Sequence, residues 1–196
     1  VATYHPSFGM RKGSRHFMHI IKKHITRAAQ IVQRGFVNWQ EPDKILNPSV
    51  QTIVDVCELF KRAPYISVDI ETNKGYHPSG KFDPFTCKVR CIGIAGVVDG
   101  KEITIAIPFR KIENDEEWWS TFEEKMRVLN AVSELLNSQK LIGHNFNFDS
   151  SVMLRLGLLK DRQIPPWADS ITMHHDTMDN DAPHGLGFVG QQYFEV

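Results

Sequence analysis

Two carboxylates lie two residues apart in the apolar, β-branched stretch Tyr65–Thr72. On a β-strand, side chains at positions i and i+2 point to the same face, so Asp69 and Glu71 would be neighbours. Two like charges this close repel, and sharing a cation relieves the repulsion. Mg²⁺ and Mn²⁺ prefer such hard oxygen ligands. The pattern therefore predicts a divalent metal site, against the alternative of two solvated acids at the end of a surface strand.

A second polar stretch follows the short apolar run Leu141–Gly143 and ends at Asp149. A helical pattern follows it, from Val152 to Leu156. We expect a strand, a tight turn and a helix here, with Asp149 near the helix start, where the helix dipole favours a carboxylate. Taken alone, this stretch is better explained by helix capping through Asn147 or Asp149.

The hydrophobic pattern predicts the elements that position these stretches. Helices are expected at 15–34, 49–62, 114–137, 168–178 and 183–193, and strands at 65–70, 89–97, 102–107 and 140–143. Asp99-Gly100 marks a hairpin turn between two of the strands. This order predicts an α/β fold, a mixed sheet flanked by helices.

The order of motifs resembles the proofreading 3′–5′ exonuclease domain of DNA polymerase I-like (family A) polymerases. Asp69-x-Glu71 on the first strand, a hairpin and a helix are followed by Asn145-x-x-x-Asp149 at the next strand end. The resemblance implies the ribonuclease H-like fold.

Two later segments extend this resemblance. Ala168–His175 and Pro183–Phe188 are similar to the family's downstream Asp-Thr-Met and His-Gly-Leu segments. The resemblance then covers roughly residues 49–196, with three motifs in the right order.

The resemblance implies two-metal hydrolysis of the terminal phosphodiesters of single-stranded DNA, with two Mg²⁺ or Mn²⁺ ions. Asp69 would bridge both ions, and Glu71 would hold the first. Asp149 would support the second, through water. One ion would activate the attacking water and the other would stabilise the leaving 3′-oxygen.

Three further residues match family positions that contact the substrate or line the site. Thr72 would contact the backbone of the terminal nucleotide. For Asn145 and Phe148 a structural role and a direct contact are equally open.

The chain departs from the family's pattern in its third motif. The family's fourth carboxylate belongs to a Tyr-x-x-x-Asp motif on a helix beyond the His-Gly-Leu segment, and no such motif follows that segment before Val196. His174 and Asp179 have the spacing of a variant of this motif. They follow Asp149 so closely in the sequence that they fall where the family has a different helix, and we therefore discount them. We therefore expect this fragment, an exonuclease fold truncated at its C-terminus, to be weakly active or inactive alone and the full-length parent to be active.

Basic charge is concentrated in the first 35 residues, which hold seven Lys or Arg and no Asp or Glu. Thr3–Ser7, Met10-Arg11 and the basic helix resemble the C-terminal end of a uracil-DNA glycosylase. In that family the histidine, here His5, contacts the carbonyl of the flipped uracil. The water-activating motif and the cluster cysteines are absent. We expect a glycosylase remnant at 1–35, a linker with two prolines at 36–48, and an incomplete exonuclease domain at 49–196.

Bulk composition is that of an ordinary globular protein, with 196 residues, zero net charge and 41% hydrophobic residues. The three cysteines form no CxxC pair, which predicts free thiols and a cytoplasmic location, in the host cytoplasm if the protein is viral. No apolar run approaches the ~20 residues of a membrane span. The sequence has no initiating Met and no signal peptide, and we expect both ends to be cuts through a longer protein.

The expected partners are a single-stranded DNA 3′ end and, in the full-length protein, a polymerase domain in cis. A polymerase with an upstream glycosylase domain would be a phage-type replicative enzyme. One alternative is a non-catalytic nucleic-acid-binding module whose basic 1–35 segment binds phosphate. Mg²⁺ dependence would distinguish this module from the exonuclease. A second alternative is a fragment of a uracil-DNA glycosylase fusion.

Overall fold

The computed structural model describes residues 15–35, 41–73, 83, 86–160, 167–177 and 184–193. The chain divides into two compact units, Pro42–Ser170 and a second unit made of Val1–Glu41 and Ile171–Val196. Both carboxylate motifs belong to the first unit, so it is the unit that positions the candidate site. His5 lies outside the described residues.

Six strands form one mixed sheet in the first unit, in the order β1-β4-β3-β2-β5-β6. The β2–β3 and β3–β4 pairs are antiparallel, whereas β1–β4, β2–β5 and β5–β6 are parallel. The strands are β1 (Asp43–Ile45), β2 (Ile66–Thr72), β3 (Val89–Val98), β4 (Lys101–Pro108), β5 (Leu141–Gly143) and β6 (Ala168–Asp169). The mixed α/β sheet predicted from the sequence is confirmed.

The β3–β4 hairpin turns at the predicted dipeptide. Asp99 has φ 51° and Gly100 has φ 78°. Two consecutive residues with positive φ are what a two-residue type I′ turn requires, and Asp-Gly adopts this conformation readily.

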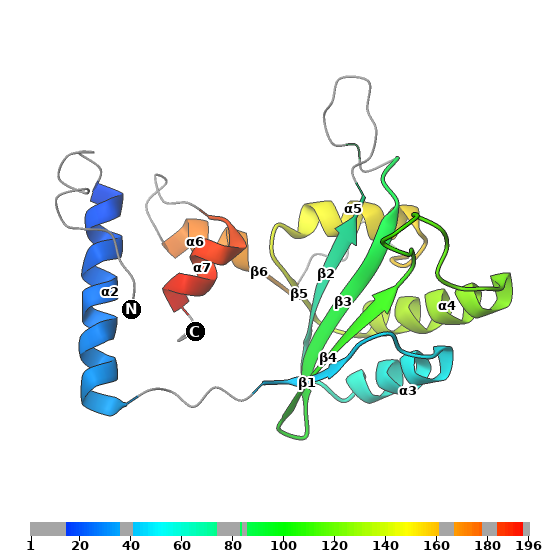
Figure 1. The fold of residues 1–196 in the computed structure, drawn as a ribbon, viewed down its shortest axis with the longest axis horizontal. Helices are drawn as coiled ribbons and strands as arrows, with labels where there is room; N and C mark the ends of the chain where they lie inside the picture. The colour runs from blue at the N-terminus through cyan, green and yellow to red at the C-terminus, as the bar shows by residue number, and fades with distance from the viewer. Residues whose placement is uncertain are drawn as a thin grey trace. The chain divides into compact units, whose positions relative to one another are not determined.

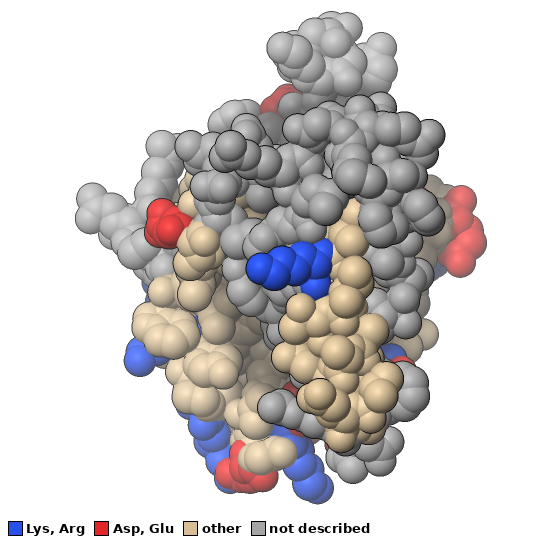
Figure 2. All heavy atoms as spheres, turned by 90° about the vertical axis from the view of Figure 1, so that its left-hand side faces the viewer, with Lys and Arg blue, Asp and Glu red and all other residues tan. Residues whose placement is uncertain are grey.

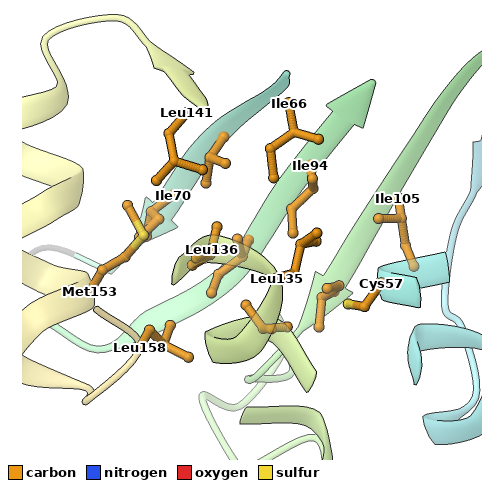
Figure 3. Packing of buried hydrophobic residues seen from close by; sticks show 14 of the residues in the cluster. Cys57, Ile66, Ile70, Ile94, Ile105, Leu135, Leu136, Leu141, Met153 and Leu158 are labelled. Atoms are coloured by element: carbon orange, nitrogen blue, oxygen red, sulfur yellow. The ribbon is translucent and has the colours of Figure 1, made fainter. Parts of the chain in front are cut away.

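Helices α3 (Val50–Phe60), α4 (Phe122–Ser138) and α5 (Phe146–Arg155) supply the other side of the core. Alternate residues of β2, namely Ile66, Val68 and Ile70, are buried against them in one contiguous cluster. Figure 1 shows α3 and α4 running beside each other along the sheet. Figure 3 shows side chains of the three helices and of β2, β3, β4 and β5 meeting in this core.

The opposite face of β2 is exposed. Ser67, Asp69 and Glu71 alternate with the buried residues and point away from the core. Their neighbours on β3, Cys91 and Gly93, are half-buried. The period-2 pattern thus places both carboxylates of the first motif on an open sheet face.

Three elements differ from the sequence expectation. β1 lies inside the expected linker, and β6 replaces the first residues of the helix expected at 168. α4 begins at Phe122 rather than at 114. Both strands are too short to show a period-2 pattern, so hydrophobic periodicity does not predict them.

A capping box fixes the start of α4. The Thr121 hydroxyl accepts a hydrogen bond from Glu124 N at 3.1 Å, and the Glu124 carboxylate accepts one from Thr121 N at 3.2 Å. Trp118 and Trp119 therefore precede the helix. Trp119 packs against the core.

The second unit contains α2 (Arg15–Arg34), α7 (Leu186–Tyr193) and all of α6 (Ser170–Thr177) except its first residue. α2 spans the predicted residues, and Gly35 ends it with φ 82°. Figure 2 shows basic and acidic side chains dispersed over a described surface that is otherwise uncharged. No described helix is long and apolar enough to cross a membrane.

Candidate functional site

The first carboxylate pair lies where β2 and β3 run side by side. Asp69 is opposite Gly93, and Glu71 is opposite Cys91. The register shifts between Glu71 and Thr72, which marks a β-bulge directly after the second carboxylate. Both acids are exposed on the open face, as their spacing predicted.

The second motif reaches β2 because β5 is short. β5 pairs with β2 only at Ile66 and Ser67, so the edge of β2 beyond them lacks a neighbouring strand. The Asp149 carboxylate takes the place of that strand and accepts a hydrogen bond from Ile70 N at 3.0 Å. Asp149 is only 4% exposed. Two motifs that are far apart in the sequence therefore meet at one strand edge.

A third acid, Asp169 at the end of β6, orients the helix that carries Asp149. Its two carboxylate oxygens accept hydrogen bonds from Asn145 N and Phe146 N, both at 2.9 Å. These amides belong to the first turn of α5, which needs acceptors from outside the helix. Asn145, the residue before α5, is left-handed with φ 59° and makes no side-chain cap. The capping role proposed for Asn147 or Asp149 belongs instead to Asp169.

Neighbouring contacts hold the turn between β5 and α5. His144 Nδ1 and Ser170 Oγ lie 2.9 Å apart, and the Ser170 hydroxyl donates to Gly143 O at 3.2 Å. A Cβ atom at Gly143 would lie 2.3 Å from Cδ2 of Phe146. Because Phe146 is buried and cannot move freely, only glycine fits at this position.

Electrostatics couple the two motifs. The pKa of Asp149 is raised to about 7, first by burial and then by the nearby Asp69 carboxylate, while the Ile70 hydrogen bond opposes the shift. Burial also raises the pKa of the Cys91 thiol, with Glu71 and Asp69 adding to the effect. No ion pair with a described Lys or Arg neutralises these three carboxylates. Within the described part of the chain, these carboxylates therefore repel one another.

Among the described residues, no group of three His, Cys, Asp or Glu side chains is arranged to hold a metal ion. The donor chemistry nevertheless fits one. Asp69, Glu71 and Asp149 are hard oxygen ligands, and a buried carboxyl beside a like charge is stabilised by a cation. These side chains would have to converge further to share an ion.

Comparisons with known proteins agree with the resemblance of the motifs. No family model matches the chain. DNA polymerase I of Borreliella burgdorferi is 25% identical over 165 residues, which are 80% of this chain and 16% of that protein. The chain thus spans about one sixth of the length of this relative.

Solved structures give the architecture. The catalytic core of RRP6 from Trypanosoma brucei aligns with 82% of this chain and 37% of its own, at 12% identity and a TM-score of 0.51. Escherichia coli RNase D, an exoribonuclease involved in structured RNA processing, aligns with 80% of this chain and 34% of its own, at 14% identity and a TM-score of 0.47. The alignment with the RRP6 core shows that the fold is ribonuclease H-like. This confirms the fold inferred from the motifs, and the polymerase I relative agrees with the sequence resemblance.

The three expected substrate residues lie in different settings. Asn145 is exposed at the start of α5. Thr72 is half-buried after the bulge. Phe148 is half-buried and packs against the core. The structure thus leaves the Asn145 side chain the most exposed of the three, whereas Thr72 and Phe148 are half-buried.

Sequence reasoning did not single out Asp169 as a site residue. Its signal was present in the Ala168-Asp169-Ser170 segment, which we read as the start of a helix. A helix start and a strand end both favour Asp, so the type of residue alone did not distinguish them. Only the pairing of β6 with β5 brings Asp169 to the first turn of α5.

Proposed function

We propose that this chain is the 3′–5′ exonuclease part of a DNA polymerase, hydrolysing terminal phosphodiesters of single-stranded DNA as a proofreading activity in the cytoplasm. One observation carries the proposal. The hydrogen bond from Ile70 N to Asp149 brings the second motif beside Asp69 at one sheet edge. The similarity to DNA polymerase I supports the choice of DNA and of a polymerase domain in cis.

Asp69, Glu71 and Asp149 would hold the Mg²⁺ or Mn²⁺ ions. When bound, divalent cations supply charge neutralisation for the scissile phosphate and lower the pKa of water. The resemblance assigns two ions, and the third motif would add a ligand to the first of them. The described residues supply three of the carboxylates this chemistry needs.

The chain's own residues would orient the reacting groups. The hydrogen bonds of Asp169 to the first turn of α5 fix the helix that carries Asp149. The same helix start presents the exposed Asn145 side chain, which would contact the terminal nucleotide. Positioning of this kind contributes to catalysis by holding the phosphate in line with its nucleophile.

Mn²⁺ calorimetry tests the metal site directly. We expect the wild-type chain to bind Mn²⁺ and Asp69→Ala to lose binding. Glu102→Ala is the matched control, since Glu102 is an exposed strand acid on β4 that lies opposite Val97 rather than near Asp149. If both variants still bind Mn²⁺, or if both lose binding, the result would contradict the proposed site.

Hydrolysis of end-labelled strands tests the reaction. We expect 3′-terminal shortening of single-stranded DNA in Mn²⁺, abolished by Asp69→Ala and retained by Glu102→Ala. Activity is expected to be weak in this chain, since the third motif is missing. Adding C-terminal sequence of the parent protein should raise it.

Two alternatives belong beside this proposal. RNA is the competing substrate, so matched RNA and DNA strands belong in the same assay. The basic α2 supports a non-catalytic nucleic-acid-binding module instead. Strand binding that is independent of Mg²⁺ and of Asp69, with no hydrolysis, would favour that module.

The N-terminal segment remains a separate proposal. Residues 1–35 would be the remnant of a uracil-DNA glycosylase with His5 as its uracil contact, joined by 36–48 to the exonuclease part at 49–196. Uracil excision by the parent protein, lost in His5→Ala, is the outcome that would support it.

A further inference from the structure

Three exposed side chains form a cluster at the edge of the sheet where the parallel strands begin. Tyr65 directly precedes β2, Lys140 precedes β5, and Trp167 precedes β6. Because β2, β5 and β6 are adjacent and parallel, their first residues lie at the same sheet edge. We refer to Tyr65, Lys140 and Trp167 as the aromatic platform.

The members of the platform are arranged for stacking. The rings of Tyr65 and Trp167 have centroids 5.6 Å apart and planes inclined by 13°. The Lys140 ammonium lies 5.3 Å from the centroid of the Trp167 ring, within the range of a cation–π contact. A pair of aromatic rings and a cation are therefore held together by three neighbouring strands.

These rings do not belong to the core. Trp167 is 56% exposed and Tyr65 is 40% exposed. Neither ring is among the residues that make up the buried cluster or pack against it. Large aromatic rings that gather at the surface together with a basic group mark an interaction site more often than a packing role.

The platform shares a sheet face with the candidate metal ligands. Side chains alternate along β2, so Tyr65 has the same parity as Ser67, Asp69 and Glu71, which are all exposed. Asp69 lies four positions along the strand from Tyr65, which is about 13 Å. An extended strand whose 3′ end reaches the carboxylates could therefore continue along this face to the platform.

We propose that the aromatic platform is a subsite for single-stranded nucleic acid, where a base on the 5′ side of the terminal nucleotide stacks on Trp167 and Tyr65. Lys140 would attract the neighbouring phosphate. Aromatic rings beside a basic group are the usual means of holding a single strand without reading its sequence. The inference rests on the proposed exonuclease function and adds a second contact point for the substrate strand.

The test compares a long strand with a short one. Labelled oligothymidylates with a hydrolysis-resistant 3′ linkage are titrated with the full chain, and fluorescence anisotropy gives Kd. An octanucleotide reaches the platform, whereas a dinucleotide occupies only the carboxylate end. We expect Trp167→Ala to raise the Kd of the octanucleotide at least about fivefold, the lower end of what removal of one stacking ring costs.

Three variants keep the test specific. Trp167→Phe retains a stacking ring and should keep most of the affinity for the octanucleotide. Lys140→Gln should weaken binding and reduce its salt dependence, because one phosphate contact is lost. Phe122→Ala is the matched control, since Phe122 is an exposed aromatic residue at the start of α4, away from the platform.

The outcomes separate the platform from the proposed function. If Trp167→Ala leaves the Kd of the octanucleotide unchanged, or if wild type binds the octanucleotide no better than the dinucleotide, the platform is not a strand subsite. Mn²⁺ calorimetry with Asp69→Ala tests the metal site independently of these two strand-binding results. A platform that docks a protein instead would give the first of these results.

Discussion

Asp149 accepts a hydrogen bond from the backbone N–H of Ile70 at 3.0 Å, at the place where β2 has no neighbouring strand. The carboxylate thus completes the hydrogen bonding of a buried strand edge and lies beside Asp69 at the same time. Structural and chemical roles coincide in one side chain, so substitutions at Asp149 must be designed to separate them.

Asp149→Ala and Asp149→Asn should differ in stability. Alanine leaves Ile70 N buried without an acceptor, which costs about 1–3 kcal/mol of unfolding free energy. Asparagine keeps an oxygen acceptor and should cost less, while both variants lose Mn²⁺ binding. Urea unfolding in EDTA measures the difference, and equal stability of the two variants would show that the hydrogen bond contributes nothing.

Asp149 should also make the metal-free protein less stable as the pH rises. Its pKa is about 7 in the folded chain, above the ordinary value of 3.8. Because the folded state binds this proton more tightly than the unfolded state, the stabilisation is complete below the unfolded pKa and is lost as the pH rises through the folded pKa. The stability of Asp149→Asn relative to the wild type should therefore increase between about pH 4 and about pH 7.

Urea unfolding of the wild type and Asp149→Asn across this pH range, in EDTA, measures the effect. Glu102→Gln serves as the control, because Glu102 is an exposed acid on β4 that lies opposite Val97 rather than near Asp149. A difference between wild type and Asp149→Asn that stays constant with pH would contradict the raised pKa. Mn²⁺ should cancel the trend in wild type by neutralising the carboxylate.

Asp169→Ala should weaken the metal site without removing a metal ligand. The substitution deletes the acceptors of Asn145 N and Phe146 N, and the loss of such a helix cap costs about 1 kcal/mol. A less firmly held α5 should reduce Mn²⁺ affinity about tenfold, as for other residues that orient a ligand. Asp176→Ala, at an exposed acid of α6, is the control for lost charge.

Asp169→Glu provides the readout that distinguishes positioning from general destabilisation. A longer carboxylate can still accept both hydrogen bonds, so it should recover part of the Mn²⁺ affinity. Unchanged affinity in Asp169→Ala, measured by calorimetry on folded protein, would mean that the cap does not control Asp149.

Gly143→Ala should disturb the turn that leads into α5. The added Cβ would lie 2.3 Å from the Phe146 ring, and relieving such a contact in a packed core costs about 1–3 kcal/mol. Gly93→Ala is the matched control, because its Cβ would meet only the Asp69 carbonyl oxygen at 3.8 Å. Urea unfolding compares them, and Phe146→Leu in the Gly143→Ala background should recover part of the loss.

Local patterns in the sequence were sufficient for several features. The spacing of Asp69 and Glu71 placed both acids on one face, because strand periodicity is a property of neighbouring residues. Asp99-Gly100 specified the hairpin turn, and Ser49 caps α3 by accepting a hydrogen bond from Thr52 N at 3.1 Å. In each case the deciding interaction lies within a few residues.

Only the tertiary structure decided how Asp149 and Asp169 are used. Asp149 reaches Ile70 because β5 ends early, and Asp169 reaches α5 because β6 pairs with β5. Neither strand is long enough for a hydrophobic period, so its place in the sheet depends on contacts between distant segments. The sequence by itself determined which residues could bind a metal ion, and the pairing of short parallel strands decided which of them meet.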